Sequence, residues 1–168
     1  MKVAFSDRDG TIIRDYPDEE WTNVYAPKFI EGALHALEKI QSKGYQIVII
    51  TNQYIIGEEI ITLTQYNDFT RKFVKTLTDN NICVLDIFYC PHARGEGCGC
   101  LKPATGLIDK AIEKFPDIDL AQSFIVGDSL SDVMMGSKLS IMTFGIGLDA
   151  ELCEYKRIES LEEVVSFI

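Results

Sequence analysis

Short, continuous apolar runs alternate with amphipathic segments along most of this chain. Runs of the length of buried strands lie at Val3 to Ser6, Tyr45 to Ile50, Val84 to Tyr89, Phe124 to Val126 and Ile141 to Phe144. Apolar residues at helical spacing predict helices over residues 32–43, 66–77 and 107–115. Ser160 and Glu163 predict a capping box at the start of a C-terminal helix. The alternation predicts an α/β fold: a doubly wound, mostly parallel, Rossmann-like sheet with helices on both faces.

Length and charge restrict the partners of the protein. A chain of 168 residues fits one domain, so we expect residues 1–168 to fold as a single unit. The 26 acidic and 16 basic residues give a net charge of -10, which disfavours nucleic acid and anionic membranes as partners. No apolar run reaches the roughly 18 to 20 residues of a membrane span, and the chain starts without an apolar signal segment. We therefore expect a cytoplasmic protein, active as a monomer, that binds a small molecule.

Polar side chains follow the predicted strands in a regular order. They are Asp7, Asp9 and Thr11 after the first strand, Thr51 and Asn52 after the second, Lys102 ahead of the third helix, and Asp128 and Asp132 after the strand at residues 124–126. Each has an ordinary structural explanation, such as a turn at Asp9-Gly10, a helix cap at Thr51 or a solvated Lys102. Because ligands of open α/β sheets bind beyond the carboxyl ends of the strands, the joint pattern favours one site there.

This set of residues is suited to phosphoryl transfer through an aspartyl-phosphate. A carboxylate that attacks a phosphate ester meets like-charge repulsion, so a divalent cation is needed, and Mg²⁺ prefers carboxylate oxygens. Asp7 and Asp128 can hold the cation from two loops, while Thr51 and Lys102 can donate to the phosphate oxygens. Asp9 can protonate the leaving oxygen and later activate water.

Four motifs resemble those of the haloacid-dehalogenase-type (HAD) phosphatases: DRDGT at 7–11, TN at 51–52, KP at 102–103 and GDSLSD at 127–132. The resemblance implies that Asp7 is the nucleophile and Asp9 the acid/base. It also implies that Mg²⁺ is bound by Asp7, Asp128 and the backbone carbonyl of Asp9, with Asp132 supporting the metal shell or the lysine. The resemblance implies that Thr51 and Lys102 bind the phosphate, and we expect the full set of substrate-binding residues to be Thr11, Thr51, Asn52, Arg94 and Lys102. The stretches after the first two motifs are too short for a large cap domain, so a capless enzyme is expected.

A cysteine and histidine cluster precedes the lysine motif. Cys90-x-His92 and Cys98-x-Cys100, five residues apart, supply a closed Cys₃His set for tetrahedral structural Zn²⁺ within a loop at 90–100. An incidental cluster or a redox switch is the alternative, whereas a disulfide framework does not suit a reducing cytosol. A closed ligand set predicts that the zinc orders the loop and takes no part in catalysis.

The zinc loop running into Lys-Pro resembles one branch of the HAD phosphatases. This branch contains D-glycero-D-manno-heptose 1,7-bisphosphate 7-phosphatases and histidinol-phosphate phosphatases, which implies heptose bisphosphate as the first candidate substrate and histidinol phosphate as the second. The branch has an arginine where this chain has Leu101, and Arg94, Arg8 or Arg14 are the available replacements for a second-phosphate ligand. A nucleic-acid 3′-phosphatase and a zinc-binding scaffold with a decayed site are less favoured alternatives.

Overall fold

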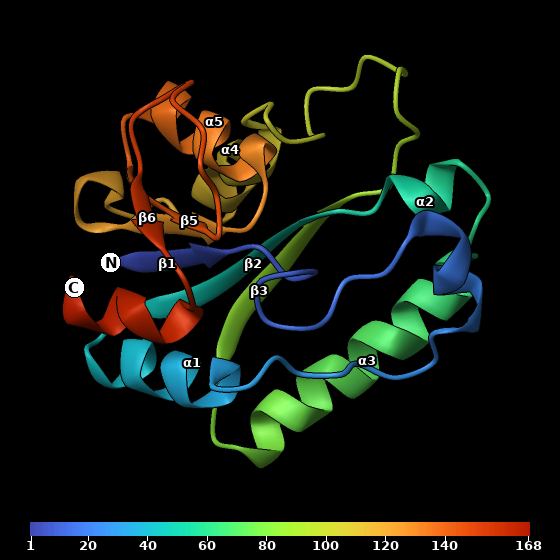
Figure 1. The fold of residues 1–168 in the computed structure, drawn as a ribbon, viewed down its shortest axis with the longest axis horizontal. Helices are drawn as coiled ribbons and strands as arrows, with labels where there is room; N and C mark the ends of the chain where they lie inside the picture. Colours follow the sequence, from blue (N-terminus) through green and yellow to red (C-terminus); the bar gives the residue numbers. More distant parts are fainter.

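The computed structural model describes residues 1–168, and its centre is a sheet of six strands in the order β3-β2-β1-β4-β5-β6 (Figure 1). All neighbouring strands run parallel. The strands are β1 (Val3–Ser6), β2 (Gln46–Asn52), β3 (Val84–Cys90), β4 (Phe124–Gly127), β5 (Met142–Ile146) and β6 (Lys156–Ile158). The chain winds outward from β1 to β3 and then returns to β4 on the other side of β1. The predicted doubly wound sheet is confirmed, with its switch point between β1 and β4.

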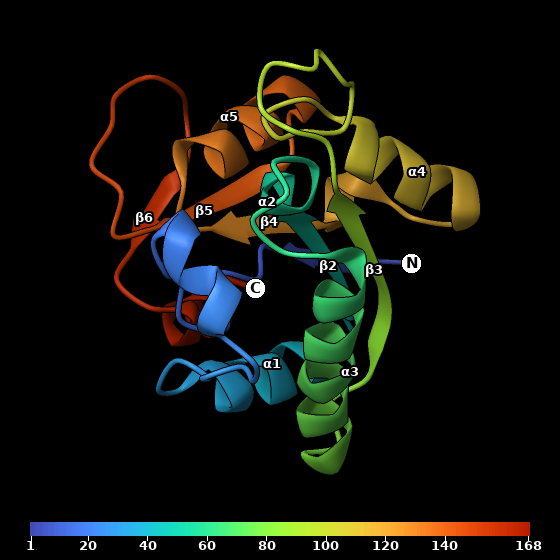
Figure 2. The ribbon, with the colours of Figure 1, turned by 90° about the vertical axis from the view of Figure 1, so that its right-hand side faces the viewer.

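Helices cover both faces of the sheet (Figures 1 and 2). They are α1 (Ala33–Ser42), α2 (Tyr54–Gly57), α3 (Leu63–Asp79), α4 (Gly106–Lys114) and α5 (Leu130–Leu139), with 3₁₀ turns η1 (Asp18–Asn23), η2 (Leu120–Gln122) and η3 (Leu161–Ser166). Successive residues of β1 enter opposite cores: Ala4 packs with α1 and α3, whereas Val3 and Phe5 pack with α4 and α5. Burial on both faces explains why the inner strands β1, β2 and β4 are continuous apolar runs.

The C-terminal segment differs from its prediction. Residues 161–166 form the 3₁₀ turn η3, and the Ser160 side chain makes no capping hydrogen bond. The Glu163 carboxylate accepts from the backbone N–H of Glu159, one residue before the expected position. A reciprocal capping box is found instead at the start of α3, where Thr62 and Gln65 bond to each other's backbone N–H.

The connections that follow β1 and β2 contain few helices and no strands. Only η1 lies between β1 and α1, and only α2 and α3 lie between β2 and β3, so neither connection contains a sheet or bundle of its own. The edge of the sheet where these strands end is therefore not covered by a cap. No helix combines the length and the apolar character that crossing a membrane requires.

Candidate active site

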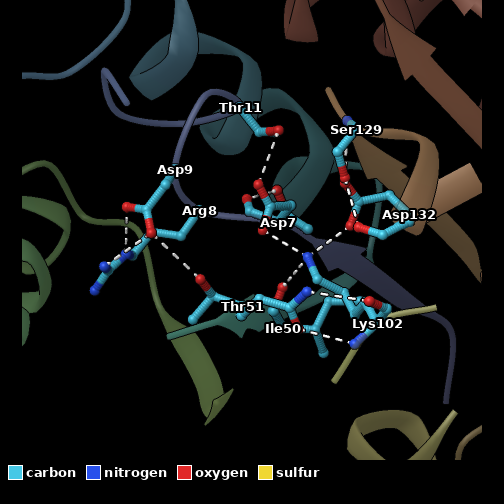
Figure 3. A network of polar contacts seen from close by, with 12 residues as sticks. Asp7, Arg8, Asp9, Thr11, Ile50, Thr51, Lys102, Ser129 and Asp132 are labelled. Atoms are coloured by element: carbon cyan, nitrogen blue, oxygen red, sulfur yellow. Dashed lines mark hydrogen bonds and ion pairs between the residues drawn. The ribbon is translucent and has the colours of Figure 1, made fainter. Parts of the chain in front are cut away.

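The buried Lys102 ammonium joins three of the predicted loops at the carboxyl edge of the sheet (Figure 3). Its Nζ donates to Asp7 Oδ1 at 2.7 Å, to Asp132 Oδ1 at 2.6 Å and to the Ile50 carbonyl at the end of β2 at 3.0 Å. The backbone N–H of Asp7 donates to the Val126 carbonyl of β4 at 2.9 Å. All three ammonium protons thus have partners, and the position of Asp7 is fixed from both neighbouring strands.

Three carboxylates are crowded around the buried Lys102 ammonium. Ligand oxygens of Asp7, Asp128 and Asp132 all lie within 4.8 Å of one another. Burial raises the pKa of Asp7 well above its usual range; Lys102 opposes this rise, and the neighbouring carboxylates add to it. Burial, followed by the charge of Asp132, raises the pKa of Asp128 to about 6. The cluster thus has an excess of negative charge that a divalent cation would relieve.

The carboxylate oxygens of this cluster differ in the hydrogen bonds that they already accept. Both Asp132 oxygens are occupied, one by Lys102 and the other by the N–H and hydroxyl of Ser129. Asp7 Oδ2 and Asp128 have only long contacts, at 3.5 and 3.4 Å, with the Thr11 hydroxyl. Asp132 is therefore placed to hold the lysine, whereas Asp7 and Asp128 fit an oxygen-liganded cation such as Mg²⁺.

Gly10 allows the first and fourth motifs to approach this closely. Its φ of +89° lies in the region that favours glycine, and a Cβ there would lie 2.0 Å from Asp128 Oδ2. Glycine at residue 10, directly after Asp9, is therefore required for this close approach. A side chain at residue 10 would displace Asp128.

The Asp9 side chain points away from the carboxylate cluster. It accepts a two-pronged pair of hydrogen bonds from Arg8, at 2.9 and 3.0 Å, and one from Gln53 Nε2 at 2.6 Å. The Thr51 hydroxyl is 3.4 Å from Asp9 Oδ2. The metal-binding role expected of Asp9 therefore concerns its backbone carbonyl and not its carboxylate.

Asn52 and Arg94 are engaged in contacts within the protein. The Asn52 amide exchanges hydrogen bonds with the backbone of Lys102, at 2.9 and 3.2 Å, and so connects β2 to the lysine loop. The Arg94 guanidinium donates to both oxygens of Glu58, at 2.7 and 2.6 Å, and to Asp18 Oδ2 at 3.0 Å. The cleft is lined by Asp7, Asp9, Thr51, Asn52, Lys102 and Asp128, whereas Thr11 and Arg94 do not line it.

Part of the cleft wall was not predicted from the sequence. The additional lining residues are Asp15, Asp18, Trp21, Gln53, Tyr54, Ile55, Ser129 and Ser131. The indole N–H of Trp21 donates to Asp15, and the hydroxyl of Tyr54 donates to Asp18. The acidic stretch after the first motif indicates these residues in retrospect, although acidic residues in an irregular segment are usually only solvated. The residues after the first motif and at the start of α2 therefore give the cleft an acidic and aromatic wall.

The four predicted zinc ligands are brought together after β3. The Cys90 Sγ lies 2.9 Å from Cys100 Sγ and 3.5 Å from Cys98 Sγ, and His92 Nδ1 lies 3.2 Å from Cys100 Sγ. Ligands about 2.3 Å from a tetrahedral zinc would lie roughly 3.8 Å apart, so the four groups are close enough to share a zinc ion once the cluster opens to that spacing. Burial opposes ionisation of Cys98, but N–H groups of Cys100 and Leu101 lower its pKa to about 7. One thiol is thus already favoured as the thiolate that zinc binds.

The fold and the site together define the class: this is a HAD-type phosphatase. The family model described as "Polynucleotide kinase 3 phosphatase" matches residues 2–141. The D-glycero-alpha-D-manno-heptose-1,7-bisphosphate 7-phosphatase of Photorhabdus laumondii is 37% identical over 150 residues, covering 84% of this chain and 79% of the relative. The chain therefore belongs to the polynucleotide kinase 3 phosphatase family of HAD phosphatases.

Two further similarities extend over nearly the whole chain. The histidine biosynthesis bifunctional protein HisB of Campylobacter jejuni subsp. doylei is 31% identical over 95% of this chain, although the match spans only 44% of HisB. The crystal structure of D,D-heptose 1,7-bisphosphate phosphatase from B. bronchiseptica, complexed with magnesium and phosphate, superposes with a TM-score of 0.85. That structure is 24% identical, and the match covers 99% of this chain and 97% of the other, so it establishes the common fold.

Proposed function

We propose that residues 1–168 form a single-domain, Mg²⁺-dependent phosphomonoesterase that works through an aspartyl-phosphate on Asp7. The observation that carries the proposal is the 2.7 Å contact between Asp7 Oδ1 and the buried Lys102 ammonium, beside Asp128. It supports a fixed nucleophile in a site with an excess of carboxylates. We propose the monomer as the active unit, because all four motifs of the site lie within a capless chain of 168 residues.

The proposed reaction has two halves. In the first, an Asp7 oxygen bonds to phosphorus while the bond to the ester oxygen breaks, and Asp9 gives its proton to that oxygen. In the second, water attacks phosphorus, Asp9 takes the proton, and the bond to Asp7 breaks to release inorganic phosphate. Mg²⁺ bound by Asp7 and Asp128 would supply positive charge against the repulsion between carboxylate and phosphate. Thr51 would donate to the equatorial phosphate oxygens, and the Lys102 ammonium would supply positive charge to them.

A structural zinc ion at Cys90, His92, Cys98 and Cys100 is part of the same proposal. The set is closed, with three sulfurs and one nitrogen, so no position is left for water or substrate. The zinc loop packs on α2, where a Cβ at Gly57 would lie 2.3 Å from the backbone nitrogen of Ala93. Zinc binding would therefore position one side of the cleft. A reducing cytosol, the proposed location, keeps these thiols available.

The first candidate substrate is D-glycero-D-manno-heptose 1,7-bisphosphate, which relatives with this name support. The second is histidinol phosphate, for which the acidic wall is a specific argument. Arg94 is neutralised by Glu58 and Asp18, and Leu101 supplies no charge, so a second phosphate would have few cationic ligands. The ammonium and imidazole of histidinol would instead face carboxylates. A net charge of -10 counts against nucleic-acid ends, and the retention of Asp7 and Lys102 counts against a decayed scaffold.

The test is phosphate release with Mg²⁺ from heptose 1,7-bisphosphate, histidinol phosphate, other sugar phosphates and a 3′-phosphorylated oligonucleotide, with Asp7→Asn as the blank. We expect turnover by the wild type, no turnover by Asp7→Asn and one substrate with a much higher kcat/KM. Equal turnover by the two proteins would refute the nucleophile. No turnover of any substrate would revive the scaffold alternative.

A further inference from the structure

Arg8, the residue between the two candidate catalytic aspartates, is one of the largest fully buried side chains in the protein. It is 1% exposed and does not line the cleft. Its guanidinium faces the Asp9 carboxylate with parallel donors, Nε to Oδ1 at 2.9 Å and Nη2 to Oδ2 at 3.0 Å (Figure 3). Such paired contacts fix the orientation of a carboxylate as well as its position. Arg8 is therefore placed to act on Asp9 and not on the substrate.

Arg8 is held in this position by α3. Its guanidinium carbon lies 5.0 Å from the ring centre of Phe69 and 5.5 Å from that of Tyr66, and Nη1 is 3.4 Å from the Thr70 hydroxyl. Asp9 is the only carboxylate that Arg8 contacts. A buried guanidinium that loses its anionic partner is strongly destabilised. Movement of Asp9 out of this orientation is therefore disfavoured by the packing of α3.

Gln53 restrains Asp9 from the end of β2. This side chain is 1% exposed, and its Nε2 donates to Asp9 Oδ2 at 2.6 Å and to the Thr51 hydroxyl at 2.9 Å. Its Oε1 is buried and has no partner, an arrangement that is unfavourable unless the amide nitrogen is needed where it is. In its ionised form the Asp9 carboxylate accepts but does not donate, which explains why the amide nitrogen faces it.

We propose that Arg8 and Gln53 are positioning residues that hold Asp9 in the orientation for proton transfer to the leaving oxygen. The inference rests on the proposed function, in which Asp9 is the acid/base. When phosphorus becomes bonded to Asp7 and the ester bond breaks, the leaving oxygen takes the Asp9 proton. A sugar alkoxide needs this proton, whereas p-nitrophenolate, a weakly basic leaving group, leaves without it. Loss of this positioning should therefore slow the reaction of alkyl esters more than that of aryl esters.

The test compares kcat/KM for mannose 6-phosphate, an alkyl ester, with that for p-nitrophenyl phosphate, both with Mg²⁺. For each ester, kcat/KM reports the steps up to departure of the leaving group and excludes the later hydrolysis of the aspartyl-phosphate. Arg8→Met keeps an unbranched apolar stem in the buried position but removes the guanidinium with its donors. General acid catalysis contributes about 10²- to 10⁴-fold, so we expect Arg8→Met to lose about 100-fold on the alkyl ester and less than about 10-fold on the aryl ester. Arg71→Met, which removes an exposed arginine of α3, is the control and should change neither rate.

Two further variants separate positioning from folding. Arg8→Lys keeps the charge without the paired donors and should recover part of the loss on the alkyl ester. If Arg8→Met fails to fold, Gln53→Met is the replacement, with the same dependence on leaving group and a smaller loss. Equal losses on both esters, or no loss, would overturn the inference while leaving the phosphatase function intact. A wild type that releases phosphate from neither ester nor from the substrate panel would overturn both.

Discussion

The excess of carboxylates in the cleft predicts that Asp128→Asn stabilises the Mg²⁺-free protein while removing its response to Mg²⁺. The pKa of Asp128 is raised from its ordinary value of 3.8 to about 6, first by burial and then by Asp132. A difference of this size corresponds to about 3 kcal/mol at neutral pH. Allowing for the partly exposed position of Asp128, we expect a gain of about 2 kcal/mol, or roughly 4 to 8 °C in Tm for a chain of this size. Asparagine keeps an oxygen for the Thr11 contact.

The effect has a defined pH dependence. The folded protein binds the Asp128 proton more tightly than the unfolded chain does, so the native carboxylate destabilises the fold increasingly as pH rises from about 4 to 6. The advantage of Asp128→Asn should therefore be full above pH 6 and fade toward pH 4. Mg²⁺ should stabilise the wild type by mass action and leave the variant nearly unchanged.

The assay is thermal unfolding from pH 4 to 8, with and without Mg²⁺ and with no chelator, so that zinc stays in place. Asp68→Asn, an exposed position paired with Arg71, is the control and should change stability by less than about 0.5 kcal/mol. An Asp128→Asn protein that is less stable than the wild type without Mg²⁺, or that responds equally to Mg²⁺, would refute the electrostatic reasoning.

Two other variants test the lysine and the zinc loop. Lys102→Met leaves Asp7 and Asp132 buried without their cation, so we expect it to lower the free energy of unfolding in urea by about 3 to 5 kcal/mol. Lys114→Met removes an exposed ion pair and should change the free energy of unfolding little. Similar losses in the two variants would contradict the proposed burial effect. Cys98→Ser should lower zinc content by elemental analysis, and lower Tm, more than it changes the Mg²⁺ dependence of turnover, whereas Cys83→Ser, at an exposed thiol outside the cluster, should keep its zinc. Equal zinc in both variants would exclude the assigned ligand set.

Strand ends and motif residues could be predicted from the sequence because both depend on local patterns. Continuous apolar runs defined the inner strands, and the polar residues directly after them met at one edge because parallel strands share it. The three-residue strand β6, from Lys156 to Ile158, has two exposed positions and gives no such pattern. The prediction of a capping box at Ser160 was wrong because the chain forms a 3₁₀ turn there.

The contacts of the predicted residues could not be predicted, because they join segments distant in sequence. Arg94 pairs with Glu58 and Asp18, which lie 36 and 76 residues away, so its guanidinium already has carboxylate partners within the protein. The Asn52 amide is hydrogen-bonded to the backbone of Lys102, 50 residues further along the chain. Nothing in the spacing of DRDG indicates that Arg8 is buried against α3. Residue types at a site follow from local sequence, whereas their partners are determined by tertiary packing.

The most direct test of the account is to trap the phosphorylated enzyme. Wild-type protein and Asp7→Asn would each be mixed with a ³²P-labelled substrate from the panel and Mg²⁺, quenched in acid within one turnover, and treated with hydroxylamine, which cleaves acyl phosphates. The account predicts protein-bound label in the wild type that hydroxylamine releases, and none in Asp7→Asn. Turnover without any bound label, or label that persists in Asp7→Asn, would contradict an aspartyl-phosphate on Asp7.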